Sequence, residues 1–225
     1  MPGFKRRRSF KRRPFRFRKR RTFRRRPMRM YRRMRSTAEV KWKVSAGVLR
    51  PDNTSPSGPT GFIPNVLSKG TDRQNRIGNK IVNLMVTVNF AISAFNNTQS
   101  RVRLTALVDK QADGTAPVYS ELYADPTSAN WHYTPFNKNW VPSRYKVIKD
   151  KMVNINIYGG NAQTTEIKTI RWKIKYRSST FYNDGNAGDI TDIIRNSIVF
   201  VVASDQGTAT APVVGVEYTF FWRDS

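Results

Sequence analysis

Apolar and polar residues alternate along most of the chain after residue 36, which is the pattern of strands with one buried and one wet face. Six segments follow this rule, with apolar members recurring at every second position of 40–44, 84–92, 102–108, 153–157, 170–176 and 214–222. In the first, we expect Val40, Trp42 and Val44 to face the core, with Lys41 and Lys43 in water. Residues 198–203 are apolar throughout, so we expect both faces of that strand to be covered. With a further short strand at 145–149, the pattern predicts eight strands.

Segments rich in Gly, Pro, Asn and Asp separate these strands, for example residues 51–64 and 159–162. No long amphipathic helix is predicted, and residues 118–123 are expected to form at most one helical turn. Eight strands with irregular connections indicate a two-sheet sandwich or a barrel, and the double-sheet jelly roll accounts for the count best. The fold class predicted for residues 36–225 is therefore all-β, an eight-stranded double-sheet jelly roll.

Two predicted connections, 51–79 and 111–144, are longer than a compact single domain usually carries. Aromatic residues are frequent in the second one, and aromatic rings are enriched where protein surfaces meet. We therefore expect these loops to contact other subunits. The candidate interface residues are Tyr119, Tyr123, Trp131, Tyr133, Phe136 and Trp140.

The charge distribution divides the chain into two domains, an arm (residues 1–35) and a body (36–225). The arm holds 19 Lys or Arg residues and no acidic residue, whereas the body holds 22 basic and 15 acidic residues. Since the net charge of the chain is +26, most of it lies in the arm. Such a segment repels itself in water, and three prolines interrupt any helix, so we expect it to be disordered until a polyanion neutralises it.

The composition of the arm favours single-stranded nucleic acid as that polyanion. Arg dominates, and its guanidinium binds phosphate with two donors and stacks on bases. Five Phe residues and Tyr31 are interleaved with the charges, as suits the unpaired bases of a single strand. The predicted nucleic-acid-binding residues are Lys5, Arg6, Arg7, Arg8, Lys11, Arg12, Arg13, Arg16, Arg18, Lys19, Arg20, Arg21, Arg24, Arg25, Arg26, Arg29, Arg32, Arg33 and Arg35.

Other interpretations of the arm are a nuclear import signal, a segment that binds acidic membrane surfaces, and a merely solvated tail. Import and nucleic-acid binding are compatible in one segment, so host import factors are candidate partners. No apolar run approaches the roughly 20 residues needed to cross a bilayer, so membrane insertion is not expected.

A second basic surface is expected on the wet face of the predicted strand 169–177. Arg171, Lys173, Lys175 and Arg177 occupy its alternate positions and are candidate phosphate contacts. A solvated strand face, whose charges discourage aggregation, is the competing interpretation.

Nothing in the sequence predicts catalysis or a cofactor. Cysteine is absent, which excludes disulfides, thiol chemistry and Cys-bound zinc. His132 is the only histidine and has no triad pattern around it, and no phosphate-binding glycine loop is present. Asp109 and Asp113 flank a turn that lacks the other positions of a calcium loop, and the aspartates near 184–192 favour a solvated loop over a metal site between subunits.

A family resemblance rests on four short sequence patches, together with the order of a basic arm followed by strands. They are Arg76-Ile77-Gly78-Asn79-Lys80-Ile81, Arg101-Val102-Arg103-Leu104 running to Val108-Asp109-Lys110-Gln111, Arg144-Tyr145-Lys146-Val147-Ile148-Lys149-Asp150-Lys151, and Tyr218-Thr219-Phe220-Phe221-Trp222-Arg223-Asp224. The chain resembles the capsid proteins of circovirus-like, Rep-encoding viruses with small circular single-stranded DNA genomes. Its strand plan is similar to that of the satellite tobacco necrosis virus coat protein.

The resemblance implies a single jelly roll, an icosahedral shell of sixty subunits, and an arm directed inward onto a DNA genome. It also implies a location in the virion and, during assembly, in the host nucleus. The alternative from the residues alone is a cellular nucleic-acid-binding module with a basic tail, of ribosomal or chaperone type. Such a module usually concentrates its basic and aromatic groups on one face or groove.

Overall fold

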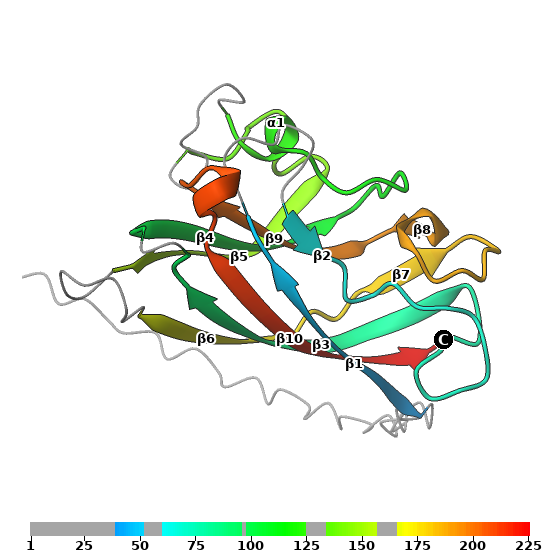
Figure 1. The fold of residues 1–225 in the computed structure, drawn as a ribbon. Coiled ribbons are helices and arrows are strands. Elements are labelled where there is room, and N and C mark those ends of the chain that lie inside the picture. The colour runs from blue at the N-terminus through cyan, green and yellow to red at the C-terminus, as the bar shows by residue number, and fades with distance from the viewer. Residues whose placement is uncertain (1–38, 52–59, 96–97, 125–133, 157–165) are drawn as a thin grey trace, which may run out of the picture. The chain divides into compact units, whose positions relative to one another are not determined.

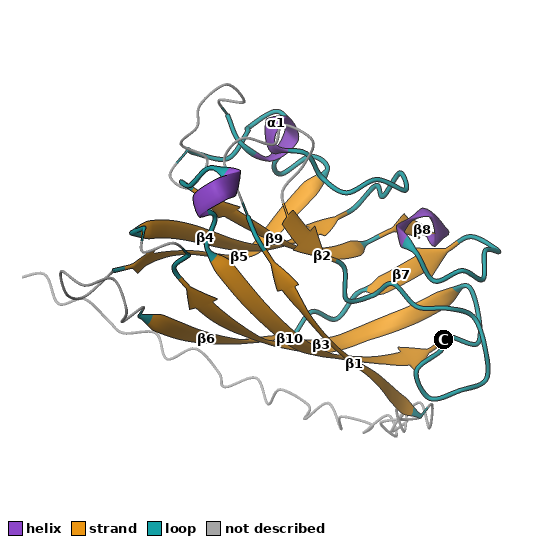
Figure 2. Ribbon diagram, in the orientation of Figure 1, coloured by secondary structure: helices purple, strands orange, loops and turns teal. Residues whose placement is uncertain are grey.

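Two antiparallel sheets are stacked face to face in the computed structural model of the protein (Figure 1). The structure describes residues 39–51, 60–95, 98–124, 134–156 and 166–225. Its strands are β1 (Val40–Leu49), β2 (Thr60–Phe62), β3 (Lys80–Ser93), β4 (Ser100–Asp109), β5 (Tyr145–Ile155), β6 (Ile167–Ile174), β7 (Ser179–Tyr182), β8 (Ile193–Arg195), β9 (Ser197–Ser204) and β10 (Val213–Asp224). The helical turns in the described part are α1 (Tyr119–Leu122) and two 3₁₀ turns, Ile190–Asp192 and Thr208–Thr210 (Figure 2). The all-β prediction is confirmed for these residues, and the arm lies outside them.

Sheet A contains six strands and sheet B contains four. In sheet A the order is β1-β10-β3, and the far side of β3 pairs with β6 over residues 86–93 and with β7 over residues 80–82; β8 then pairs with β7. Sheet B has the order β2-β9-β4-β5. Chain neighbours such as β1 and β2 therefore lie in different sheets, and the chain crosses between the layers repeatedly.

The number of predicted strands was wrong in two ways. The predicted strands 145–149 and 153–157 are one strand, β5, because Asp150 between them pairs with Arg103 on β4 at 2.9 Å and so fits within the sheet. Residue 157, which ends the second of them, lies outside the described residues. Strands β2, β7 and β8 were not predicted, since segments of three or four residues are too short to display a period of two.

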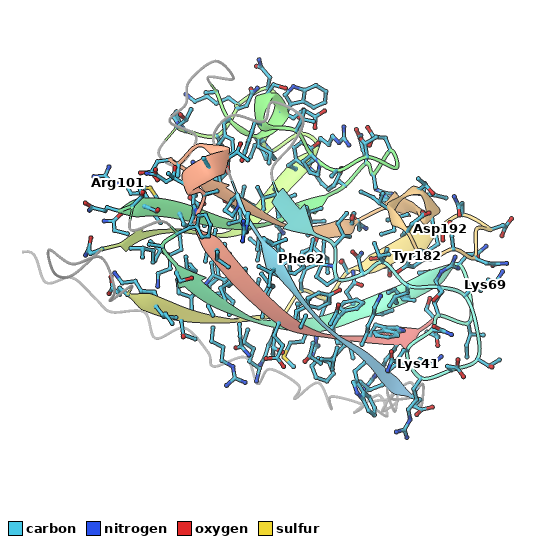
Figure 3. All side chains as sticks on the ribbon, in the orientation of Figure 1. Lys41, Phe62, Lys69, Arg101, Tyr182 and Asp192 are labelled. Carbon is cyan, nitrogen blue, oxygen red and sulfur yellow. The ribbon has the colours of Figure 1, made fainter. Side chains whose placement is uncertain are left out.

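The main core lies between the two sheets and is built from the alternating positions. Phe90 of β3 meets Trp172 of β6 edge to face at 5.3 Å, and Phe62 of β2 stacks on Phe200 of β9 at 4.7 Å. Phe62 accordingly lies between the layers in Figure 3. Strand β9 is buried along its whole length, which confirms the prediction that both its faces are covered.

Strand β1 has the orientation opposite to the predicted one. Lys41 is only 4% exposed, with Nζ 2.9 Å from Asp224 of β10 and donating to the carbonyl of Asn75 at 2.9 Å. Lys43 donates to the carbonyl of Val66, and burial lowers the pKa of its amine. The alternation of apolar residues and lysines in β1 was predicted correctly, but its direction was not. The ion pair between Lys41 and Asp224 at the end of β10 places Lys41, and with it Lys43, on the inner face. The apolar members, such as Trp42, therefore face outward.

A second core covers the outer face of sheet B. Leu107 of β4 and Val199 and Val201 of β9 pack there against Leu122 of α1 and Tyr123, which directly follows it. Figure 2 shows α1 over this side of sheet B. The single helical turn predicted within 118–123 is confirmed. Burying this face explains why β4 and β9 are covered on both sides.

This second core corrects part of the predicted subunit interface. Tyr119 and Tyr123 are fully buried within the chain, so their rings offer no surface to a neighbouring subunit. Phe136 is half-buried and stacks on Tyr123 at 5.9 Å, whereas Trp140 is exposed. Trp131 and Tyr133 lie outside the described residues. The aromatic content of this loop serves, in these cases, to cover a sheet of its own chain.

Candidate nucleic-acid interface

The outer face of sheet A, which points away from sheet B, changes from basic to apolar across the strands. Residues that stand opposite one another on neighbouring strands share a face, so the strand register defines the rows of this surface. One row is Lys173–Thr87–Thr219–Val44, and the next is Arg171–Asn89–Glu217–Ala46. Four strands in a row at about 4.8 Å spacing span roughly 14 Å from the basic end to the apolar end.

The basic end contains the four residues predicted to bind phosphate. Arg171 and Lys173 lie on β6, while Lys175 and Arg177 follow in the connection to β7, because β6 ends at Ile174. All four side chains are exposed, and none pairs with a carboxylate among the described residues. One exposed carboxylate, Glu217, stands in the second row. The face therefore carries a local excess of unneutralised positive charge.

The apolar end exposes a tryptophan. Trp42 of β1 is 38% exposed on this face and stands opposite Phe221 of β10. The guanidinium of Arg73 lies 5.0 Å from the centre of its ring, and Arg73 also forms an exposed ion pair with Glu39 at 3.5 Å. An exposed aromatic ring beside cations is the combination that binds single-stranded nucleic acid.

Three residues of this same face were missed by the sequence analysis: Lys80, Phe181 and Arg195. Phe181 of β7 pairs with Lys80 of β3 on one side and with Arg195 of β8 on the other. Their strands pair in segments of two or three residues, so no periodic pattern marks them. Lys80 lies in the segment Arg76–Ile81, which was noted for its family resemblance and not as a predicted binding site.

The four patches that carry the resemblance meet in pairs and are structural. Backbone amide Ile77 donates to Asp224 at 3.2 Å, which joins the first patch to the fourth. Arg144 forms a buried ion pair with Asp109 at 2.9 Å, which joins the second patch to the third. The hydrogen bonds that Arg144 donates to the Asp109 carboxylate raise the pKa of Arg144 further above its ordinary value.

Arg76 is the deepest cation of these patches, fully buried with its guanidinium 4.3 Å from the ring centre of Tyr182. It donates to the carbonyls of Leu67 at 3.2 Å and Gly78 at 2.9 Å, and also to the carbonyl of Gly185. These bonds join the segment before β3 to the loop after β7, near the labelled Tyr182 and Asp192 in Figure 3. Arg76 therefore organises the loops at this end of the body.

The aspartates considered as metal ligands make local bonds. Asp189 accepts a hydrogen bond from the amide of Thr191 at 2.9 Å, and Asp192 accepts one from the amide of Gly188 at 2.7 Å. Asp109 and Asp113 both contact Arg144. Across the described ranges, no group of three or more acidic, His or Cys side chains is arranged to hold a metal ion. His132 lies outside those ranges.

No helix in the described part of the chain is long and apolar enough to span a membrane. Comparison with known proteins adds no identification: no family model matches the chain, and no curated protein sequence matches it either.

Proposed function

We propose that this chain is a capsid protein that self-assembles into a small icosahedral shell and packages a single-stranded DNA genome through its Arg-rich arm. The observation that carries the proposal is the separation of charge along the sequence, with 19 basic residues and no acidic residue in the first 35. A segment of that kind binds phosphate regardless of sequence, as packaging of a whole genome requires.

The order of the strands supports the jelly roll within this proposal. If β6 and the short β7 and β8 are taken together as one interrupted edge, sheet A reads β1-β10-β3-β6 and sheet B reads β2-β9-β4-β5. Successive strands then alternate between two four-stranded layers, except for β4 and β5, which are neighbours in sheet B, and the first strand lies beside the last. Double Greek-key connections of this kind define jelly rolls, the architecture common in viral capsid domains.

The basic outer face of sheet A supports an inward orientation of that sheet in the shell. A packaged genome lies inside the shell, so exposed cations on one face of the body are useful for packaging where that face is turned inward. Sixty arms would bring on the order of 1,100 positive charges, enough to pair with a similar number of phosphates. The number sixty, the DNA genome and assembly in the host nucleus come from the resemblance, whereas import factors as partners follow from the basic arm.

The basic face is tested by reversing two of its charges. The double variant Lys173→Glu, Lys175→Glu is expected to assemble shells that contain less nucleic acid, by roughly 15%, because four of the 26 net positive charges of each chain are lost. The measurement is the ratio of absorbance at 260 and 280 nm in nuclease-treated, purified particles.

The matched control is Lys138→Glu, Lys151→Glu, which removes the same charge at two exposed positions outside sheet A. It is expected to package as the unchanged protein does. Intact shells of the Lys173/Lys175 variant with a normal nucleic-acid content would rule out the basic face as a genome contact and leave packaging to the arm.

A further inference from the structure

A pocket opens on the outer face of sheet A beside Phe181. Its volume is about 480 Å³, and it is lined by Asn79, Lys80, Phe181, Tyr182, Ile194, Arg195 and Ser225. Two large apolar side chains are left partly in water there, Phe181 at 36% exposed and Ile194 at 53%. Exposed apolar groups gathered in a concave site are a common mark of a binding surface.

Cations flank the aromatic ring on both sides. Lys80 and Arg195 are the cross-strand neighbours of Phe181, and side chains in such positions have Cβ atoms about 5 Å apart. The amine of Lys80 lies 5.6 Å from the centre of the Phe181 ring. No carboxylate side chain lines the pocket, and neither cation forms an ion pair with another described residue.

From this arrangement we infer that the pocket binds an unpaired nucleobase, which stacks on Phe181 while the phosphates on either side of it contact Lys80 and Arg195. An aromatic ring provides a sequence-tolerant platform because every base has a flat face, and flanking cations follow the backbone of the strand. A duplex cannot use the site, since its bases are already paired and stacked. The inference rests on the proposed function and adds a preference of the folded body for single strands.

Charge complementarity favours nucleic acid over a second copy of this chain as the occupant. The pocket presents two cations that have no ion-pair partner within the part of the chain that the structure describes, and the chain as a whole has a net charge of +26. A second copy would have to bring a carboxylate to meet them, whereas a nucleotide brings its phosphates in any orientation. Arg177 and Lys175, in the connection that leads to β7, extend the basic surface toward β6.

The test is photo-crosslinking of the full-length protein to a single-stranded DNA oligonucleotide that contains 5-iododeoxyuridine, with the crosslinked peptides identified by mass spectrometry. The unchanged protein is expected to give a crosslink at Phe181 in addition to crosslinks in the arm. Phe181→Leu, which keeps an apolar side chain but removes the ring, is expected to lower that crosslink about fivefold or more, and Phe181→Tyr to retain it. A double-stranded oligonucleotide is expected to crosslink only in the arm.

Phe95→Leu is the matched control, because Phe95 is also a partly exposed ring under a cation, with Arg50 4.7 Å from its centre, but lies outside the pocket. It is expected to leave the Phe181 crosslink unchanged. Crosslinks in the arm without any at Phe181 would overturn the pocket and leave the proposed function standing. No crosslinks anywhere would contradict the proposed function itself. Loss of assembly in Phe181→Leu with the arm crosslinks retained would assign the pocket to a contact between copies instead.

Discussion

Deleting residues 1–35 is expected to leave the body folded and to abolish packaging of nucleic acid. The deletion removes 19 positive charges, and the remaining 22 basic and 15 acidic residues leave a net charge of only +7. Since phosphate neutralisation dominates sequence-independent binding, affinity at physiological salt should fall by several orders of magnitude. The measurement combines β-rich circular dichroism with the nucleic-acid content of nuclease-treated protein.

The control for this deletion keeps the charge and removes the rings. Replacing the arm residues Phe4, Phe10, Phe15, Phe17, Phe23 and Tyr31 by Leu should retain most of the packaged nucleic acid, because the phosphate contacts remain. Loss of the β-sheet signal in the deletion variant would show that the arm is part of the fold. Normal packaging by the protein without its arm would contradict this prediction and show that the body binds the genome.

The largest expected effect on stability comes from Asp109→Ala. Asp109 is 1% exposed and accepts three contacts from Arg144, the shortest at 2.9 Å, as well as the amide of Gln111. Its removal leaves a buried guanidinium without its main partner, which typically costs 3–5 kcal/mol. Asp113 and Glu121 still contact Arg144, so we expect about 3 kcal/mol of lost unfolding free energy, measured by urea denaturation.

Glu39→Ala provides the comparison, because it removes the carboxylate of an ion pair that is well exposed on both sides. Its expected change in unfolding free energy is within about 0.5 kcal/mol. Equal effects of the two substitutions would contradict the structural role assigned to the buried cluster of Arg144.

The strands that could be predicted are those whose alternation agrees with the burial of their side chains. In β3, β6 and β10 the predicted apolar members Phe90, Trp172 and Phe220 all lie in the main core. In β1 the same alternation led to the wrong face, because a lysine amine can be buried when a carboxylate from another strand meets it. That partner, Asp224, lies far away in the sequence, so the pattern of β1 alone could not reveal the inversion.

Polar contacts between segments that are distant in the sequence could not be predicted from it either. Asn65, Asn83 and Thr180 are fully buried and joined by hydrogen bonds of 3.0 and 2.8 Å to the Thr180 hydroxyl. At this end a single residue, Asn196, separates β8 in sheet A from β9 in sheet B, with a φ of 61°. Asn adopts this left-handed conformation more readily than most residues. However, an Asn between two apolar segments does not by itself indicate that the chain crosses from one sheet to the other.

The candidate site was predictable only where charge alternates along one strand. Arg171 and Lys173 were identified because they occupy the wet positions of a clear period-two segment, and both are exposed on the outer face of sheet A. The pocket at Phe181 depends on β3, β7 and β8 meeting in short pairings. Sites formed by such pairings require the register between strands, which residue patterns within one segment do not contain.

The most direct test of the central claim is light scattering of the purified full-length protein behind a sizing column, with absorbance at 260 and 280 nm before and after nuclease treatment. The proposed capsid function predicts a particle of about 1.6 MDa of protein, as expected for sixty chains of 26.0 kDa, with nucleic acid that resists the nuclease. A small species that loses all of its nucleic acid to nuclease or high salt would contradict it and favour a binding module with a basic tail.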